Sequence, residues 1–482
     1  MRLRDPSLLR EQCFVGGAWV GTPATAVNDP ATGELVARVP RFGAAETRDA
    51  VEKAAAAFPA WSKLTGKARA KILRAWFDLI IANRDDLALI MTTEQGKPLA
   101  EAAGEIDYAA GFVEFSGEEA KRVYGETSLS HREDARIVVV KQPIGVVGAI
   151  TPWNFPAAMI TRKCAPALAA GCTVVCKPAG QTPFTALALA ALAERAGMPA
   201  GVFNVLTGKA SEIGGELTAN PLVRCIAFTG STEVGKLLMQ QAAATVKKVA
   251  LELGGNAPFI VFDDADLDQA VEGAIFSKFR NMGQTCICAN RIYVQDKVYD
   301  RFAERLAAAT AKLKVGRGTE PGVMQGPLIN MDAVEKVEHH IADAVGKGAK
   351  VVTGGHRHKL GGTFFEPTVL TGLTRDMLVT REETFGPVAP LYRFQTEKEA
   401  IELANDTEFG LAAYFYARDI GRIWRVGEGL EYGMVGINSG AISTELAPFG
   451  GVKESGLGRE GSHYGVEEFV EVKYMLMGGL DR

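Results

Sequence analysis

The sequence predicts an α/β fold with two doubly wound parallel-sheet domains, and three observations support this. The chain has 482 residues, which is too long for one compact core and suits two or three domains. Short apolar runs such as IGVVGAI, CTVVC and CIAF are typical of strands that are buried on both faces. Helical stretches of about 10 to 15 residues separate most of these runs, which indicates a parallel sheet covered by helices.

The expected elements follow in order along the chain. Residues 44–121 are expected to be helical, because runs such as RAKILRAWFDLIIANRDDLALI place apolar residues at helical spacing. From Ile137 onward strands and helices alternate, and a second alternating region begins at APFIVF. A domain boundary is therefore predicted near Glu252 to Asn256. The segments SLSHREDARIVVVKQ and EEFVEVKYMLM alternate like exposed strands, which seek a partner edge.

The composition argues against several classes of protein. With 53 Lys and Arg against 57 Asp and Glu, the formal net charge is −4, so bulk charge would not attract nucleic acid or a membrane. No uncharged run reaches the ~18 apolar residues of a spanning helix. The start, MRLRDPSLLREQ, lacks the apolar region of a signal peptide. Seven cysteines do not form a disulfide framework in so long a chain. We expect a soluble cytoplasmic enzyme.

Two glycine-rich motifs and a histidine pair resemble functional motifs, but each lacks a residue or a structural context that the function requires. Residues 230–236, GSTEVGK, match the start of a P-loop, but Leu237 stands where Ser or Thr would hold Mg²⁺, which argues against NTP hydrolysis. Residues 456–461 have GxGxxG spacing without the preceding strand of a dinucleotide-binding unit, which favours a glycine-rich turn. His356 and His358 have no neighbouring Cys or carboxylate, so no metal site is predicted.

Three short motifs carry candidate catalytic residues. Cys286 ends FRNMGQTC, a small polar turn that leaves a thiol accessible for attack on a carbonyl. Glu252 ends an apolar strand in LELGGN, where partial burial makes a carboxylate a candidate general base. Asn154 lies between two prolines in PWNFP and is a preorganised donor for an oxyanion. Taken alone, each motif has an inert interpretation: a turn cysteine, a solvated strand end and a rigid turn.

Together these motifs resemble those of one family. LELGGN followed by GQTC, with PWNFP upstream and EETFGPV downstream, is similar to the NAD(P)-dependent aldehyde dehydrogenase superfamily over essentially the whole chain. The resemblance implies that Cys286 attacks an aldehyde, and that Asn154 and the Cys286 N–H hold the thiohemiacetal oxyanion. It also implies hydride transfer to the nicotinamide, followed by hydrolysis of the thioester by water that Glu252 activates.

The resemblance further implies a domain organisation. A Rossmann-like cofactor domain is expected at 1–121 and 142–252, and a catalytic domain at 253–450. A small β oligomerisation arm is expected at 122–141 and 466–482, where the two exposed strand segments lie. In the family such an arm extends a neighbour's sheet, so we expect a homodimer or homotetramer.

The resemblance also implies the cofactor site. Lys177 would reach the adenosine ribose, residues 230–235 would lie under the pyrophosphate at a helix start, and Glu383 with Phe385 would fix the nicotinamide. NAD-preferring relatives often carry Glu at the position of Gly180, where it repels a 2′-phosphate. We therefore expect NADP⁺ to be accepted, with NAD⁺ as an alternative. The predicted cofactor residues are Thr151, Pro152, Trp153, Lys177, Pro178, Ala179, Gly180, Gly230, Ser231, Thr232, Glu233, Val234, Gly235, Leu253, Glu383 and Phe385.

Within the superfamily the chain looks most like succinate-semialdehyde dehydrogenases, on the strings MITRKCAPALAAGC, FRNMGQTCICANR and APFGGVKESGLGREG. Arg162, Arg280 and Ser443 correspond to family positions that bind the distal carboxylate, for which arginine provides a bidentate fork. One methylene changes binding by only ~1–3 kcal/mol, so glutarate semialdehyde remains an alternative substrate. A broader aldehyde dehydrogenase is the other alternative.

Cys288, two residues after the nucleophile, is predicted to be its redox partner. Residues i and i+2 of an extended chain have Cα atoms at most ~6.6–7.2 Å apart, and disulfides usually need ~4.4–6.8 Å. Peroxide should therefore inactivate the enzyme reversibly through a Cys286–Cys288 disulfide. Cys288→Ala should keep its activity, but dithiothreitol should no longer restore it after peroxide, because an unresolved sulfenic acid oxidises further. Recovery equal to that of the wild type would reduce Cys288 to a packing residue.

Overall fold

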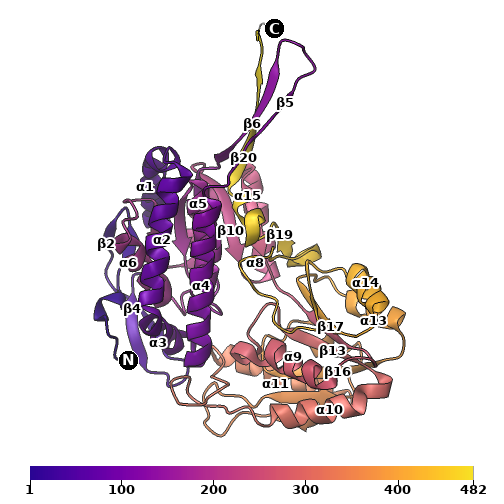
Figure 1. Ribbon diagram of the computed structural model, residues 1–482. Helices are drawn as coiled ribbons and strands as arrows, with labels where there is room; N and C mark the ends of the chain where they lie inside the picture. Colours follow the sequence, from indigo (N-terminus) through magenta and orange to yellow (C-terminus); the bar gives the residue numbers. More distant parts are fainter. Residues whose placement is uncertain (481–482) are drawn as a thin grey trace.

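Two large sheets organise the computed structural model, which describes residues 1–480 (Figure 1) and confirms the predicted α/β class. The first sheet has the strand order β19-β11-β10-β7-β8-β9-β1-β2. Its central strands, from β11 to β9, are parallel, and antiparallel strands close both ends. The bounds are β1 Cys13–Val15, β2 Ala18–Val20, β7 Val146–Ile150, β8 Thr173–Lys177, β9 Phe203–Val205, β10 Val223–Thr229, β11 Lys248–Glu252 and β19 Gly456–Leu457.

The helices expected over residues 44–121 are present as α1 to α4. Thr65 begins α2 by accepting a hydrogen bond from the Ala68 N–H, and Gly96 ends α3 with a left-handed φ of 95°. Two buried tryptophans tie these helices to later ones, because Trp61 and Trp76 donate to carbonyls of α5 and α6. The bounds are α1 Ala44–Ser62, α2 Gly66–Ala82, α3 Arg84–Gln95, α4 Leu99–Glu119, α5 Ala158–Ala170, α6 Phe184–Arg195, α7 Ala210–Ala219, α8 Thr232–Ala242 and α15 Ser462–Glu467.

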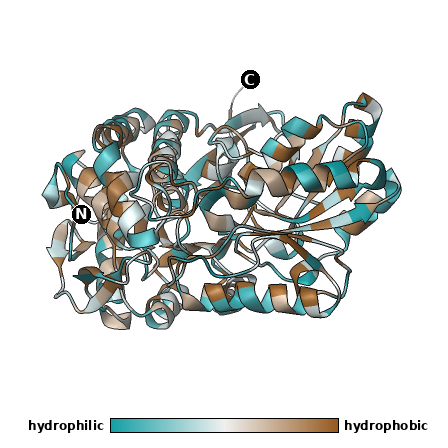
Figure 2. Ribbon diagram, turned by 90° about the horizontal axis from the view of Figure 1, so that it is seen from below, coloured by the Kyte–Doolittle hydropathy of each residue, from teal (hydrophilic) through white to brown (hydrophobic). Residues whose placement is uncertain are grey.

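The second sheet has the order β14-β15-β16-β13-β12-β17-β18 and is parallel except between β14 and β15. Its strands are β12 Ala257–Val261, β13 Ala289–Gln295, β14 Lys350–Thr353, β15 Thr368–Thr371, β16 Val388–Phe394, β17 Ala412–Tyr416 and β18 Met434–Ile437. Its helices are α9 Leu267–Phe279, α10 Asp296–Thr310, α11 Met331–Gly346, α12 Leu378–Arg381, α13 Glu397–Asn405 and α14 Ile420–Gly429. Figure 2 shows helices that mix hydrophilic and hydrophobic residues, as expected where one face is buried and the other exposed.

A three-stranded arm projects from the body and carries the C-terminal end of the chain at its tip (Figure 1). Its order is β20-β6-β5, with bounds β5 Glu126–Leu129, β6 Arg136–Pro143 and β20 Val470–Met477. Several apolar side chains on it are exposed: Leu129, Val472, Tyr474, Met475, Leu476 and Met477. A three-stranded sheet with exposed apolar side chains has no hydrophobic core of its own.

Three features were not predicted from the sequence. Residues 456–461 are only partly a turn, because Gly456–Leu457 forms β19 beside Leu251 and Glu252. Strands β1 and β2 extend the first sheet, and β3 (Thr25–Asn28) and β4 (Leu35–Val39) form a separate hairpin. The short 3₁₀ helices are Pro6–Leu8, Ala243–Thr245, Arg280–Gly283 and Lys453–Ser455. The predicted domain boundaries stay predictions, since strand pairing does not measure independent folding units.

The segment that connects the two large sheets passes beside the candidate active site. Strand β11 ends at Glu252 and β12 begins at Ala257, so the segment between them passes directly from one sheet to the other. Strands β7, β8, β10 and β11 are parallel, and their carboxyl ends therefore share one edge of the first sheet. No helix within residues 1–480 combines the length and the apolarity needed to cross a membrane. The cytoplasmic location expected from the sequence stays a prediction.

Candidate active site

The three candidate catalytic residues lie at or after the ends of helices and strands of the two sheets. Asn154 follows β7, Glu252 ends β11, and Cys286 lies between α9 and β13. A cavity of about 370 Å³ brings many of the predicted residues together. Those on its wall are Pro152, Trp153, Asn154, Gly230, Ser231, Leu253, Cys286, Glu383 and Phe385.

Cys286 differs from the other cysteines of the chain in its exposure. Its side chain is partly accessible, whereas the remaining six thiols are buried. Burial raises the pKa of Cys286 to about 12, although the positive charge of Arg162 acts to lower it. In the free protein the sulfur is therefore a protonated thiol at neutral pH, and its reactivity depends on loss of that proton.

Glu252 is a buried carboxylate without a hydrogen-bond partner for its Oε2 atom in the part of the chain that the structure describes. Burial raises its pKa well above the ordinary value, and the nearby negative charge of Glu460 raises it further. Glu460 in turn forms ion pairs with Lys163 and with Arg162. A buried carboxylate with a raised pKa and a free oxygen has the properties of a general base.

Asn154 is held by a network of buried amides that the sequence analysis missed. Its carbonyl accepts hydrogen bonds from Lys97 Nζ (2.8 Å) and Asn281 Nδ2 (3.0 Å). Its own Nδ2 donates to the Gln284 carbonyl at 3.2 Å, and Asn281 Nδ2 donates to the same carbonyl. An amide nitrogen carries two hydrogens, so Asn154 keeps a second N–H for an oxyanion.

Two further buried residues support this network from α3 and α4. Gln95 Nε2 donates to Asn281 Oδ1 at 3.0 Å. Glu105 forms an ion pair with Lys97 and accepts the N–H groups of Ala157 and Ala158 at the start of α5. The segment before Cys286 is also strained, because Asn281 and Met282 have positive φ angles of 51° and 57°. Such strain persists only where the surrounding contacts hold it.

The predicted adenosine end of the cofactor site is open at Gly180. A Cβ added there would find nothing within 4 Å, and the residue is exposed. Lys177 is buried and donates from Nζ to the Pro178 carbonyl at 3.0 Å. Thr182 has a buried hydroxyl oxygen without a partner within residues 1–480. An open position beside a lysine is compatible with a nucleotide carrying an extra phosphate.

Gly230 and Ser231, of the predicted pyrophosphate residues 230–235, and the predicted nicotinamide residues Glu383 and Phe385 line the cavity of Cys286. Ser231 begins α8 and accepts a hydrogen bond from the Val234 N–H, and a helix N-terminus of this kind favours anions. Across the cavity, Glu383 Oε1 accepts a hydrogen bond from the Gly255 N–H at 3.2 Å, and burial raises its pKa to about 7. The rings of Phe385 and Trp153 pack edge-to-face with their centroids 5.6 Å apart. The backbone of Phe385 is in the left-handed region, with a φ of 53°. These residues fit a dinucleotide, and a nicotinamide bound there would supply a hydride acceptor beside Cys286.

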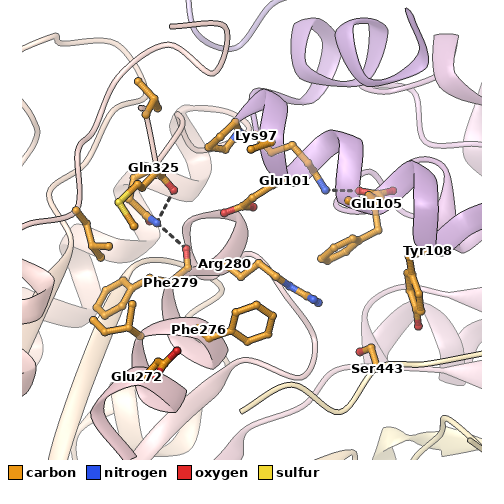
Figure 3. Close-up of a pocket in the computed structure, with 18 residues that line it drawn as sticks. Lys97, Glu101, Glu105, Tyr108, Glu272, Phe276, Phe279, Arg280, Gln325 and Ser443 are labelled. Atoms are coloured by element: carbon orange, nitrogen blue, oxygen red, sulfur yellow. Dashed lines mark hydrogen bonds and ion pairs between the residues drawn. The ribbon is translucent and has the colours of Figure 1, made fainter. Parts of the chain in front are cut away.

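A second cavity, of about 680 Å³, contains two of the three predicted substrate residues, Arg280 and Ser443 (Figure 3). It adjoins the first cavity, because the consecutive residues Asn154 and Phe155 line one cavity each. The Arg280 guanidinium lies over the rings of Phe155 and Phe276, at 4.9 and 5.5 Å from their centroids. No ion pair of Arg280 is present within residues 1–480, which leaves its fork free for a ligand.

Arg162, the third predicted substrate residue, has a different environment. It is 2% exposed, and its Nη2 lies 2.6 Å from Glu460 Oε2. Its guanidinium also packs on Phe449 at 3.8 Å from the ring centroid. Direct contact between Arg162 and a substrate stays a prediction, since its charge is already paired with Glu460.

The predicted redox partner Cys288 lies in the core. Its thiol is fully buried and donates to the Lys278 carbonyl, with a distance of 3.2 Å between the heavy atoms. A disulfide to Cys286 would have to break this bond and move the segment between the two cysteines. The redox role stays a prediction.

Comparisons with known proteins agree with this geometry. The family model described as "Aldehyde dehydrogenase family" matches residues 19–475. A Pseudomonas aeruginosa protein named glutarate-semialdehyde dehydrogenase is 65% identical, with 100% of each chain covered. An Escherichia coli K12 protein named succinate-semialdehyde dehydrogenase, NADP(+), is 63% identical over 99% of this chain and 100% of its own.

The solved structures include that of a succinate-semialdehyde dehydrogenase from Burkholderia pseudomallei. It superimposes with a TM-score of 0.98 at 65% identity, and the match covers 99% of each chain. Cys286 and Asn154 thus line one cavity together with Leu253, the residue after Glu252, in a fold that these relatives share. The chain belongs to the aldehyde dehydrogenase family, whose members oxidise aldehydes with NAD(P)⁺.

Proposed function

We propose that the protein oxidises succinate semialdehyde to succinate with NADP⁺. The observation that carries this proposal is Arg280, a cation without an ion pair in residues 1–480, on the wall of the cavity beside the Cys286 loop. The other cation on that wall, Lys97, is paired with Glu105. A guanidinium provides a bidentate fork for a carboxylate, so the free arginine favours an aldehyde with a distal carboxylate.

A second candidate function is the oxidation of glutarate semialdehyde. One relative carries that substrate in its name, and the cavity of about 680 Å³ leaves room for another methylene. A methylene changes pocket affinity by only ~1–3 kcal/mol, so both semialdehydes are expected to react and to differ in KM.

The residues of the chain suggest the order of the chemical steps. Once deprotonated, Cys286 attacks the aldehyde carbon and forms a C–S bond, and the resulting oxyanion lies beside the free N–H of Asn154 and the Cys286 N–H. A nicotinamide held by Glu383 and Phe385 would accept the hydride, which would leave a thioester on Cys286. Glu252, with its raised pKa and free Oε2, then removes a proton from the water that attacks the thioester, and the acid is released.

The arm supports a proposal about assembly. Its exposed apolar side chains and the free edges of β5 and β20 suit pairing with another copy of the chain. We propose a homodimer or homotetramer in which the arm contacts a neighbouring subunit.

The first test compares acid and neutral aldehydes. Wild-type protein should have a much lower KM for succinate semialdehyde than for butanal, and Arg280→Ala should raise the KM for the acid about 10- to 100-fold. The KM for butanal should hardly change, since it carries no charge for the guanidinium. Arg305→Ala, on the outer helix α10, is the matched control. Equal losses for both substrates would reject Arg280 as the carboxylate anchor.

The second test concerns cofactor choice. Gly180→Glu should lower the ratio of kcat/KM for NADP⁺ to that for NAD⁺ about tenfold or more, because a carboxylate placed in the open space repels a 2′-phosphate. Gly180→Gln, of similar size but neutral, separates charge from bulk. If wild-type kcat/KM for NADP⁺ is below about a hundredth of that for NAD⁺, the NADP⁺ proposal is wrong.

The third test follows the protonation of Cys286. Because burial raises its pKa to about 12, the thiolate fraction should increase about tenfold per pH unit from about pH 6 to about pH 9. Alkylation by iodoacetamide without cofactor should increase in the same way, with Cys286→Ala as the background. A plateau below about pH 8 would show that the free enzyme already holds a thiolate.

A further inference from the structure

The hydroxyl of Tyr108, on α4, is a buried polar group that the steps above do not use. Its oxygen is buried and has no hydrogen-bond partner within residues 1–480, and the side chain lines the cavity of about 680 Å³. Buried tyrosine hydroxyls usually find a partner, because an unpaired one loses its bonds to water without replacement. A missing partner on a cavity wall therefore points to a ligand.

The surroundings of Tyr108 fix the ring and leave the hydroxyl free. The ring meets Phe112 edge-on at 5.0 Å, which holds its orientation. Glu105 lies one helical turn earlier, but it already binds Lys97 and two backbone N–H groups. Figure 3 shows Tyr108 pointing toward Ser443, with the Arg280 side chain reaching into the same space.

The charges nearby indicate which ligand would suit this hydroxyl. Burial raises the pKa of Tyr108, although the positive charges of Arg162 and Arg280 and the neighbouring Ser443 hydroxyl act to lower it, so the group remains a neutral donor. The cavity wall carries the Arg280 guanidinium and the hydroxyls of Tyr108 and Ser443, together with the ion pair of Lys97 and Glu105 and the carboxylates of Glu101 and Glu272. A carboxylate accepts at both oxygens, so the Arg280 fork alone does not use all of its acceptor sites.

We propose that Tyr108 is a specificity-determining residue whose hydroxyl donates a hydrogen bond to the distal carboxylate of the substrate, together with Arg280 and Ser443. This inference rests on the proposed function, because it assumes an acid aldehyde in the second cavity. It adds a donor from α4, an element from which the sequence analysis named no site residue. The selectivity of the pocket then depends on both domains, since Arg280 follows α9.

The test uses Tyr108→Phe, which keeps the ring and removes only the hydroxyl. The KM for succinate semialdehyde should increase about tenfold or more, as expected for a lost hydrogen bond to a charged group, with kcat nearly unchanged. The KM for butanal should stay the same or decrease. Binding of the product succinate, measured by calorimetry, should weaken by a similar factor. Tyr464→Phe, on α15, whose side chain is exposed and outside this cavity, is the control.

Each outcome separates this inference from the function on which it rests. If the wild type prefers succinate semialdehyde over butanal and Tyr108→Phe keeps that preference, the role of Tyr108 is overturned and the proposed function stands. If the wild type shows no preference for the acid, the proposed function fails first. A loss that is equal for both aldehydes, or confined to kcat, would assign Tyr108 a structural role.

Discussion

The buried ion pair between Lys97 and Glu105 connects the separate parts of the active site. Lys97 donates to the carbonyl of Asn154, and Glu105 accepts the first N–H groups of α5. The loop that holds the oxyanion donor is therefore fixed to α4 through charged groups away from water. Removing one partner of such a pair costs about 3–5 kcal/mol, because the other charge stays buried and unpaired. The precision of the site depends on this contact.

Burial of the reacting groups has a second consequence. Partial burial raises the pKa of the Cys286 thiol, and full burial raises that of the Glu252 carboxyl. The reactivity of Cys286 therefore depends on the loss of its proton. Arg162 moderates this effect by lowering the pKa of Cys286, and its own charge is balanced by Glu460. The Cys286 thiol thus becomes reactive when it loses its proton.

The residues proposed to bind the substrate carboxylate and the residues proposed to react with the aldehyde lie in two adjoining cavities. The smaller one carries Cys286 and the residues expected to hold the cofactor, and the larger one carries Arg280 with the hydroxyls of Tyr108 and Ser443. Arg280 and Cys286 belong to one short segment, so a carboxylate bound at Arg280, as proposed, would hold the aldehyde of a short substrate near the sulfur. Substrate length would then decide whether the aldehyde reaches Cys286.

The sequence by itself determined the fold class and the family, because apolar periodicity and short motifs are local signals. It also predicted Cys286 and Asn154 as candidate catalytic residues, because each lies in a recognisable short motif. Only the tertiary structure revealed that Lys97 supports Asn154 and that Tyr108 faces Ser443. These pairs lie far apart along the chain, and no local pattern marks them. Whether a polar group is satisfied, charged or free for a ligand depends on which distant side chains fold against it.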